Sequence, residues 1–119
     1  MTVEIEFTDE FGDWWEGLSA DEQDSVRDGV ELLRQLGVSL SFPYSSGISG
    51  SRHPHMRELR IQHHGKPYRV LYAFDPRRAA TLLIGGDKTG EDRWYEVFVP
   101  VADRLYDRHI EELRKEGLI

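Results

Sequence analysis

The stretch MRELRIQHHGKPYRVLYAFDPRRAATLLI, residues 56–84, decides the fold. Apolar and polar side chains alternate over residues 56–62, so Leu59 and Ile61 belong to one face of a strand. Residues 68–75 alternate in the same way, and residues 80–84 form a third, apolar run. Only short polar turns separate the three runs. They therefore predict three adjacent strands in an antiparallel meander.

The segment before this meander predicts one strand and two helices. Residues 2–7 alternate as a half-buried strand, and Thr8 can cap a short helix directly after it. Ser19 and Glu22 have the spacing of a capping box, which marks the start of a second helix. Gly37 is expected to end that helix.

The remaining segments complete the predicted order of elements. Residues 38–54 are rich in Ser, Gly and Pro and predict a loop. Pro100 predicts the first turn of a last amphipathic helix, because proline lacks only a backbone N–H that is free at that position. The order β-α-α-β-β-β-α predicts an α+β fold of a single domain, residues 1–119. We expect a small antiparallel sheet with the helices packed on one of its faces.

The composition narrows the class of protein. With 119 residues, 39% of them hydrophobic, the chain can bury one modest core. No apolar run approaches the roughly 18 residues of a membrane span, and the N-terminal segment is acidic, unlike a signal peptide. We therefore expect a cytoplasmic protein with no membrane partner. The chain has no cysteine, which excludes disulfides and thiolate metal sites.

The charge is distributed unevenly along the chain. The net charge is −7, but residues 38–88 hold eight Lys and Arg against three Asp and Glu, a local net charge of +5. The segments on either side are both acidic. This asymmetry favours a basic face on an acidic scaffold, which can attract an anionic substrate.

Three motifs give this order of elements a family resemblance. The sequences ELR at 58–60, YRVLY at 68–72 and GGDKTG at 85–90 together resemble the RelE/HigB toxin superfamily, most closely its phage-derived HigB-like branch. The resemblance implies an endoribonuclease that cuts mRNA in the ribosomal A site. It also implies a cognate antitoxin that silences the toxin in a hetero-oligomer, often a helix-turn-helix DNA-binding protein. No cofactor is implied.

RNA cleavage without a metal needs a group that stabilises negative charge on the phosphate, and arginine suits this role. Arg69 matches the arginine of the superfamily's YR motif. Arg60 falls on the neighbouring strand and points away from the Leu59 face. We expect the two guanidinium groups to line a hollow that receives a ribose-phosphate chain. A surface salt bridge for Arg69 and a structural role for Arg60 are the alternatives.

Further candidates surround this pair. Lys88 matches a basic residue at the end of the last strand in relatives, where two glycines would let the backbone approach the substrate. Tyr95 occupies a position comparable to a functional tyrosine in some relatives, and His64 can supply an acid or a base. The general acid and base stay open. The residues expected to bind RNA without reacting are Arg52, Arg57, Lys66 and His63.

Three other interpretations compete with a metal-free nuclease. Four histidines lie within residues 53–64, but their spacing matches no zinc signature, so no metal site is predicted. A ParE-like toxin that inhibits DNA gyrase would have the same fold. A non-catalytic phage or host interaction module would use exposed aromatic side chains as partner contacts, namely Trp14, Trp15, Trp94 and Tyr95.

Overall fold

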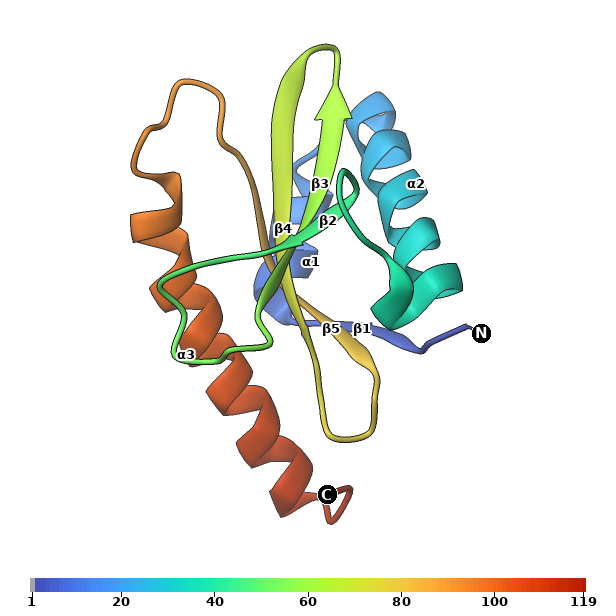
Figure 1. Ribbon diagram of the computed structural model, residues 1–119, viewed down its shortest axis with the longest axis vertical. Coiled ribbons are helices and arrows are strands. Elements are labelled where there is room, and N and C mark those ends of the chain that lie inside the picture. Colours follow the sequence, from blue (N-terminus) through green and yellow to red (C-terminus); the bar gives the residue numbers. More distant parts are fainter. Residues whose placement is uncertain (1) are drawn as a thin grey trace.

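The computed structural model describes residues 2–119 as a five-stranded sheet with helices on both sides (Figure 1). None of the helices in this range combines the length and the apolar character that a bilayer crossing requires. In chain order the elements are β1 (Ile5–Phe7), α1 (Asp9–Glu16), α2 (Ala20–Leu36), the 3-10 helix η1 (Gly37–Ser39), β2 (Ser45–Gly47), β3 (Arg57–His63), β4 (Lys66–Phe74), β5 (Ala80–Asp87) and α3 (Trp94–Lys115).

The sheet has the strand order β1-β5-β4-β3-β2. The predicted meander is confirmed, since β3, β4 and β5 pair antiparallel, and the α+β class and the order of the main elements are confirmed as well. The sheet is nevertheless mixed, because β1 pairs parallel to β5. The segment predicted as a loop contains the short edge strand β2. Its sequence, Ser-Ser-Gly, has no apolar alternation that could have revealed it.

The expectation that all helices cover one face of the sheet is wrong. One core cluster joins α1 and α2 to the face that carries Val70 and Tyr72, and a second joins α3 to the face that carries Leu71 and Ala73. Figure 1 shows α2 and α3 on opposite sides of the sheet. The reason lies in β4, which is apolar on both faces in its second half, so that both faces must be covered.

The predicted start signals of the first two helices are confirmed. The Thr8 hydroxyl accepts the Phe11 N–H, and Ser19 and Glu22 form the full capping box. The third helix begins at Trp94, six residues before the predicted start at Pro100. Trp94 and Val99 are buried against the sheet, and this packing extends the helix past a proline that removes one backbone hydrogen bond.

Gly85 and Gly86 allow close packing on both faces of β5. A Cβ atom on Gly85 would lie 2.3 Å from the Trp14 ring, and one on Gly86 would lie 2.7 Å from the indole nitrogen of Trp94. The two glycines were expected to let the backbone approach a substrate. In the structure they instead let tryptophans from α1 and α3 contact the strand.

Candidate functional site

The pairing of β3 with β4 places Arg60 directly opposite Arg69. Both side chains lie on the α3 face of the sheet, because the alternation that buries Leu59 on the α2 side turns its neighbour to the other side. The sequence left the register of these two strands open, and the structure sets the two arginines opposite each other. The Arg69 side chain is 7% exposed and the Arg60 side chain 30% exposed.

The carboxylate of Glu58 occupies the space between the two guanidinium groups. Its Oε1 lies 3.4 Å from Arg69 Nε, and its Oε2 lies 3.2 Å from Arg60 Nη1. The expectation of an open, guanidinium-lined hollow is wrong for this reason. Glu58 was missed as a site residue, although the ELR motif carries the signal: a residue two positions before Arg60 on a strand shares its face.

Glu58 is held by partners from four elements. Tyr95 of α3 donates its hydroxyl to Oε1 at 2.5 Å, and Ser46 of β2 donates to Oε2 at 2.7 Å. Arg69 donates one hydrogen bond, from Nη1 to the Tyr68 carbonyl at 3.0 Å. Its Nε is buried and has no hydrogen-bond partner among the described residues. A buried donor without a hydrogen-bond partner calls for an explanation, and a catalytic role is one of those known.

The hydroxyl of Tyr95 keeps its proton at neutral pH. Burial raises the pKa of Tyr95, and the hydrogen bond to Glu58 and the charge of that carboxylate raise it further, while Arg69 acts in the opposite direction. Lys88 lies beside this residue, with its Nζ 5.7 Å from the Tyr95 ring centroid. The structure thus brings Arg60, Arg69 and Tyr95 together around Glu58, with Lys88 beside Tyr95, and we call these five residues the Glu58 site.

The two histidines at the tip of the β3–β4 hairpin lie away from the Glu58 site. His63 is hydrogen-bonded through Nδ1 to the Ser25 hydroxyl of α2 at 2.7 Å, and the His64 ring lies edge-to-face against that of His63, with the centroids 4.2 Å apart. His64 is four residues beyond Arg60, or about 13 Å along an extended chain. The structure therefore does not bring this candidate acid or base to the arginine pair.

The other candidate RNA-binding residues are also dispersed. Arg57 donates from Nε to Ser45 Oγ at 3.0 Å, and it lies on the α2 side of β3, away from Arg60. Lys66 is exposed at the hairpin tip. Arg52 forms an ion pair with Asp107 of α3 at 2.7 Å. None of the three contacts Glu58.

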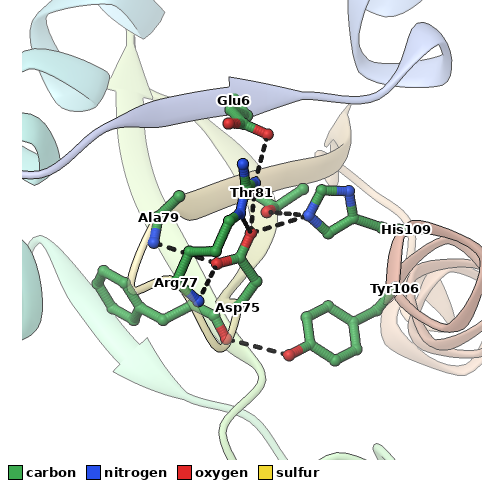
Figure 2. A network of polar contacts seen from close by, with 8 residues as sticks. Glu6, Asp75, Arg77, Ala79, Thr81, Tyr106 and His109 are labelled. Carbon is green, nitrogen blue, oxygen red and sulfur yellow. Dashed lines mark hydrogen bonds and ion pairs between the residues drawn. The ribbon is translucent and has the colours of Figure 1, made fainter. Parts of the chain in front are cut away.

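A second polar cluster lies where β4 ends (Figure 2). Asp75, whose side chain is fully buried, accepts hydrogen bonds from Arg77 and contacts Nε2 of His109 at 3.0 Å. Arg77 also reaches Glu6 of β1 at 2.7 Å. We call these four residues the Asp75 cluster.

The chemistry of the Asp75 cluster is that of a structural network. Thr81 and Asp75 both contact the same nitrogen of His109, Nε2, so the ring cannot relay a proton between them. Within residues 2–119, Glu6, Asp75 and His109 are the one group of metal-ligating side chains that come close together. The guanidinium of Arg77 already supplies the positive charge between the two carboxylates.

The aromatic side chains expected to form an interaction surface are mostly engaged in packing. Trp94 is 2% exposed, Trp14 and Trp15 are half-buried against the core, and Tyr95 is bonded to Glu58. The expectation that these four form an exposed partner surface is wrong. The aromatic side chains with large exposed fractions are instead Phe7, Phe42 and Tyr44.

Comparison with known proteins places the chain in a family. The profile of the phage-derived Gp49-like protein family matches residues 13–107. Two proteins of Mycobacterium tuberculosis that bear toxin names are similar in sequence. HigB3 is 40% identical over 92 residues, which is 76% of this chain and 79% of HigB3. HigB2 is 35% identical over 99 residues, which is 82% of this chain but only 49% of HigB2.

Solved structures with the same fold are more distant in sequence. The isolated E. coli RelE toxin aligns with a TM-score of 0.57 at 12% identity, over 83% of this chain and 98% of RelE. A chain of the intact E. coli RelBE toxin-antitoxin complex aligns with a TM-score of 0.54 at 13% identity, over 71% of this chain and 94% of that chain. This chain therefore belongs to the phage-derived Gp49-like family, within the RelE/HigB superfamily of toxins.

Proposed function

We propose that this protein is the toxin of a toxin–antitoxin pair and that it acts in the cytoplasm by cutting mRNA on the ribosome. One observation carries this proposal: two arginines set opposite each other converge on a buried carboxylate that also accepts a tyrosine hydroxyl. Such a cluster of ionisable groups, in a chain related to named toxins, favours acid–base chemistry on an anionic substrate.

The Glu58 site has the groups that RNA cleavage requires. The ribose 2′-hydroxyl attacks the adjacent phosphorus, and the Glu58 carboxylate accepts its proton. Arg69 stabilises the charge that develops on the phosphate oxygens with its guanidinium group, whose Nε faces Glu58 at 3.4 Å but makes no hydrogen bond to the described residues. The bond from phosphorus to the 5′-oxygen then breaks, and this oxygen takes a proton from Tyr95.

The hydrogen bond between Tyr95 and Glu58 closes the cycle. After the cut, Glu58 carries the proton of the 2′-hydroxyl and Tyr95 has lost its own. Transfer between the two oxygens, 2.5 Å apart in the free protein, restores both groups. The products are a 2′,3′-cyclic phosphate and a 5′-hydroxyl end. Lys88, beside Tyr95, adds positive charge for the neighbouring phosphate.

The free protein holds its arginines neutralised. Glu58 pairs with both, so an incoming phosphate must compete with this carboxylate for Arg60 and Arg69. Arg60 is the more exposed of the two and is the group that a phosphate meets first. Activity therefore depends on a substrate that is held in position, which favours a ribosome-bound message over free RNA.

An antitoxin is the partner that the proposal requires. One of the solved structures with this fold is a RelBE toxin-antitoxin complex. We expect a cognate antitoxin, of the helix-turn-helix DNA-binding type, to form a hetero-oligomer with this chain and to block access to Arg60.

The test is controlled expression in cells that lack the antitoxin. The wild type should arrest growth and produce new mRNA 5′-hydroxyl ends in phase with codons. Arg69→Lys keeps the charge but loses the planar fork and its Nε donor, so it should abolish both effects. Arg114→Lys makes the same exchange at an exposed position near the end of α3 and should behave as the wild type.

A second candidate function is supported by the same ion pairs. A carboxylate that neutralises two arginines is also typical of a structural network, and a toxin that inhibits DNA gyrase through protein contacts needs no catalytic site. Growth arrest with intact messages and loss of supercoiling activity in a gyrase assay would support this function and contradict the nuclease.

A further inference from the structure

Two exposed aromatic side chains precede strand β2 and lie beside Arg60. Phe42 is 70% exposed and Tyr44 is 52% exposed, which is unusual for side chains of this size. We propose that these two rings, with Arg60, form a stacking platform for an unpaired base of the RNA next to the bond that is cut. This inference rests on the proposed function and names a substrate contact for the same site.

Arg60 connects the platform to the Glu58 site. Its guanidinium carbon lies 5.1 Å from the centroid of the Phe42 ring, and its Nη1 lies 3.2 Å from the Glu58 carboxylate. The backbone N–H of Arg60 also donates to the Tyr44 carbonyl at 2.8 Å, which fixes the aromatic segment against β3. A single side chain therefore contacts both the candidate catalytic carboxylate and the exposed ring.

The geometry of Phe42 suits a nucleobase. The Arg60 guanidinium covers one face of the ring, and much of the rest of the side chain is exposed to solvent. Sequence-tolerant binding of single-stranded RNA uses this combination, in which bases stack on aromatic rings and arginine holds the backbone. Stacking of a base on Phe42 would complete a layer of base, ring and guanidinium.

The groove next to the platform distinguishes the base from the phosphate. It has a volume of about 350 Å³, and its lining includes Tyr44, Arg60, Gln62 and Asp28. The Asp28 carboxylate repels a phosphate but can accept a hydrogen bond from an amino group on a base. We therefore assign the phosphate to the side of Arg60 that faces Glu58, and the base to the exposed part of the Phe42 ring, next to this groove.

The experiment measures binding separately from cleavage. A short single-stranded RNA, methylated at every 2′-oxygen so that it cannot be cut, is titrated with purified toxin by fluorescence anisotropy. Phe42→Leu and Tyr44→Leu should each weaken binding by about 5- to 150-fold, which corresponds to the 1–3 kcal/mol typical of one stacked base. Phe7→Leu removes an equally exposed ring from the opposite edge strand and should leave the affinity unchanged.

The outcomes separate this inference from the proposed function. Equal RNA affinity of Phe42→Leu and wild type overturns the platform. The proposed nuclease function is retained in that case if the wild type still cuts messages in cells. Weaker RNA binding by Phe42→Leu in a toxin that cuts no message supports the platform and overturns the nuclease. Failure of the wild type to bind the RNA overturns the platform. Loss of antitoxin binding by Phe42→Leu, with RNA affinity retained, overturns it in favour of a protein-binding surface.

Discussion

Glu58 and Asp75 are two buried carboxylates on the same face of the sheet, and both are paired with arginine. Asp75 accepts hydrogen bonds from two backbone N–H groups and from Arg77, and most of these partners belong to the turn that follows β4. The partners of Glu58 come from β2, β3, β4 and α3, and one of them, Arg69, keeps an unsatisfied donor.

Under the proposed function, this difference separates a structural carboxylate–arginine pair from a reactive one. The hydrogen-bonding capacity of the Asp75 carboxylate is already filled by partners near its own turn. Its charge therefore stabilises the fold and is not available to a ligand. We expect a carboxylate shared by four elements, beside a donor that makes no hydrogen bond and the partly exposed Arg60, to exchange partners when an anion arrives. The two regions should therefore respond in opposite ways to substitution, one in activity and the other in stability.

The largest expected effect is on activity at the Glu58 site. Glu58→Gln keeps the size of the side chain but removes the base, and it should lower the rate of message cleavage by about 10²- to 10⁴-fold. Tyr95→Phe should cause a loss in the same range without removing a charge. Tyr106→Phe is the matched control, because Tyr106 lies on the same helix and donates to the Phe74 carbonyl at 3.1 Å.

The measurement is cleavage of a message on purified ribosomes, with the melting temperature of each variant recorded beside it. Tyr95→Phe and Tyr106→Phe should melt at similar temperatures. A Tyr106→Phe variant as inactive as Tyr95→Phe would show that α3 affects cleavage only through stability. That result would contradict the difference in role between the Glu58 site and the Asp75 cluster.

The next effect is on stability at the Asp75 cluster. Asp75→Ala leaves the buried part of Arg77 with Glu6 alone and removes one of the two partners of His109, so unfolding should become easier by about 3–5 kcal/mol. Six residues of strand, about 20 Å, separate Asp75 from Arg69, and activity per folded molecule should not change. Urea denaturation measures the first quantity, and ribosomal cleavage at low temperature measures the second.

Asp13→Ala supplies the reference for this experiment. Asp13 is exposed on α1, and its substitution should shift the urea midpoint by no more than about 0.5 kcal/mol in free energy of unfolding. If Asp75→Ala stayed as stable as Asp13→Ala but lost cleavage, the roles of the two carboxylates would have to be exchanged.

A smaller effect is expected where packing supports the site. Gly86→Ala places a Cβ atom 2.7 Å from the Trp94 indole nitrogen and should destabilise the protein by about 1–3 kcal/mol. Since Tyr95 follows Trp94 in the chain, a shift of the indole should also reduce cleavage. Gly17→Ala is the control for the loss of a glycine, because a Cβ atom there would lie 3.5 Å from its nearest neighbour and the φ of −80° suits alanine. Equal activity of both variants would contradict the link between the glycine and the position of Tyr95.

Most of the fold could be predicted from local patterns. Alternation over residues 56–84 identified the meander and even the face shared by Arg60 and Arg69, because a strand fixes side-chain direction with a period of two. The position of α3 could not be predicted in this way. An amphipathic helix has one apolar stripe that fits either face of a sheet, and the choice depends on the two-sided core of β4.

The site was predicted in part for the same reason. Register brought Arg60 and Arg69 together, and the contacts of Lys88 and Tyr95 depend on how α3 returns to the sheet. The pairing of Glu58 with both arginines was not predicted, because Lys and Arg dominate the charge of this segment. Strand alternation nevertheless places Glu58 on the same face as Arg60. His63 is still paired, with Lys66, but the same alternation turns it to the α2 face, where it contacts Ser25, and His64 lies in the turn beyond the last pair.

The smallest expected effect concerns pH and a third contact, between Tyr68 of β4 and Glu22 of α2. The Tyr68 hydroxyl donates to the Glu22 carboxylate. This hydrogen bond, with those from Ser19, lowers the pKa of Glu22 to about 2, while burial and the same carboxylate raise the pKa of Tyr68 to about 12. A lowered carboxyl pKa gives stability that is lost as the pH falls from about 4 to about 2, and a raised phenol pKa gives stability that is lost as the pH rises from about 10 to about 12.

Tyr68→Phe should therefore remove the loss of stability between about pH 10 and pH 12. It should also reduce the loss of stability between about pH 4 and pH 2. Part of the loss of stability at low pH that remains in this variant comes from Asp75. Burial raises the pKa of Asp75, but the hydrogen bonds from Arg77 and His109 outweigh burial and leave the pKa below its ordinary value. Urea midpoints measured from pH 3 to pH 11 test this assignment. If Tyr68→Phe lost as much stability at high pH as the wild type, the contact between Tyr68 and Glu22 would not be the source of that loss. The pH dependence of stability would then come from groups other than Tyr68 and Asp75.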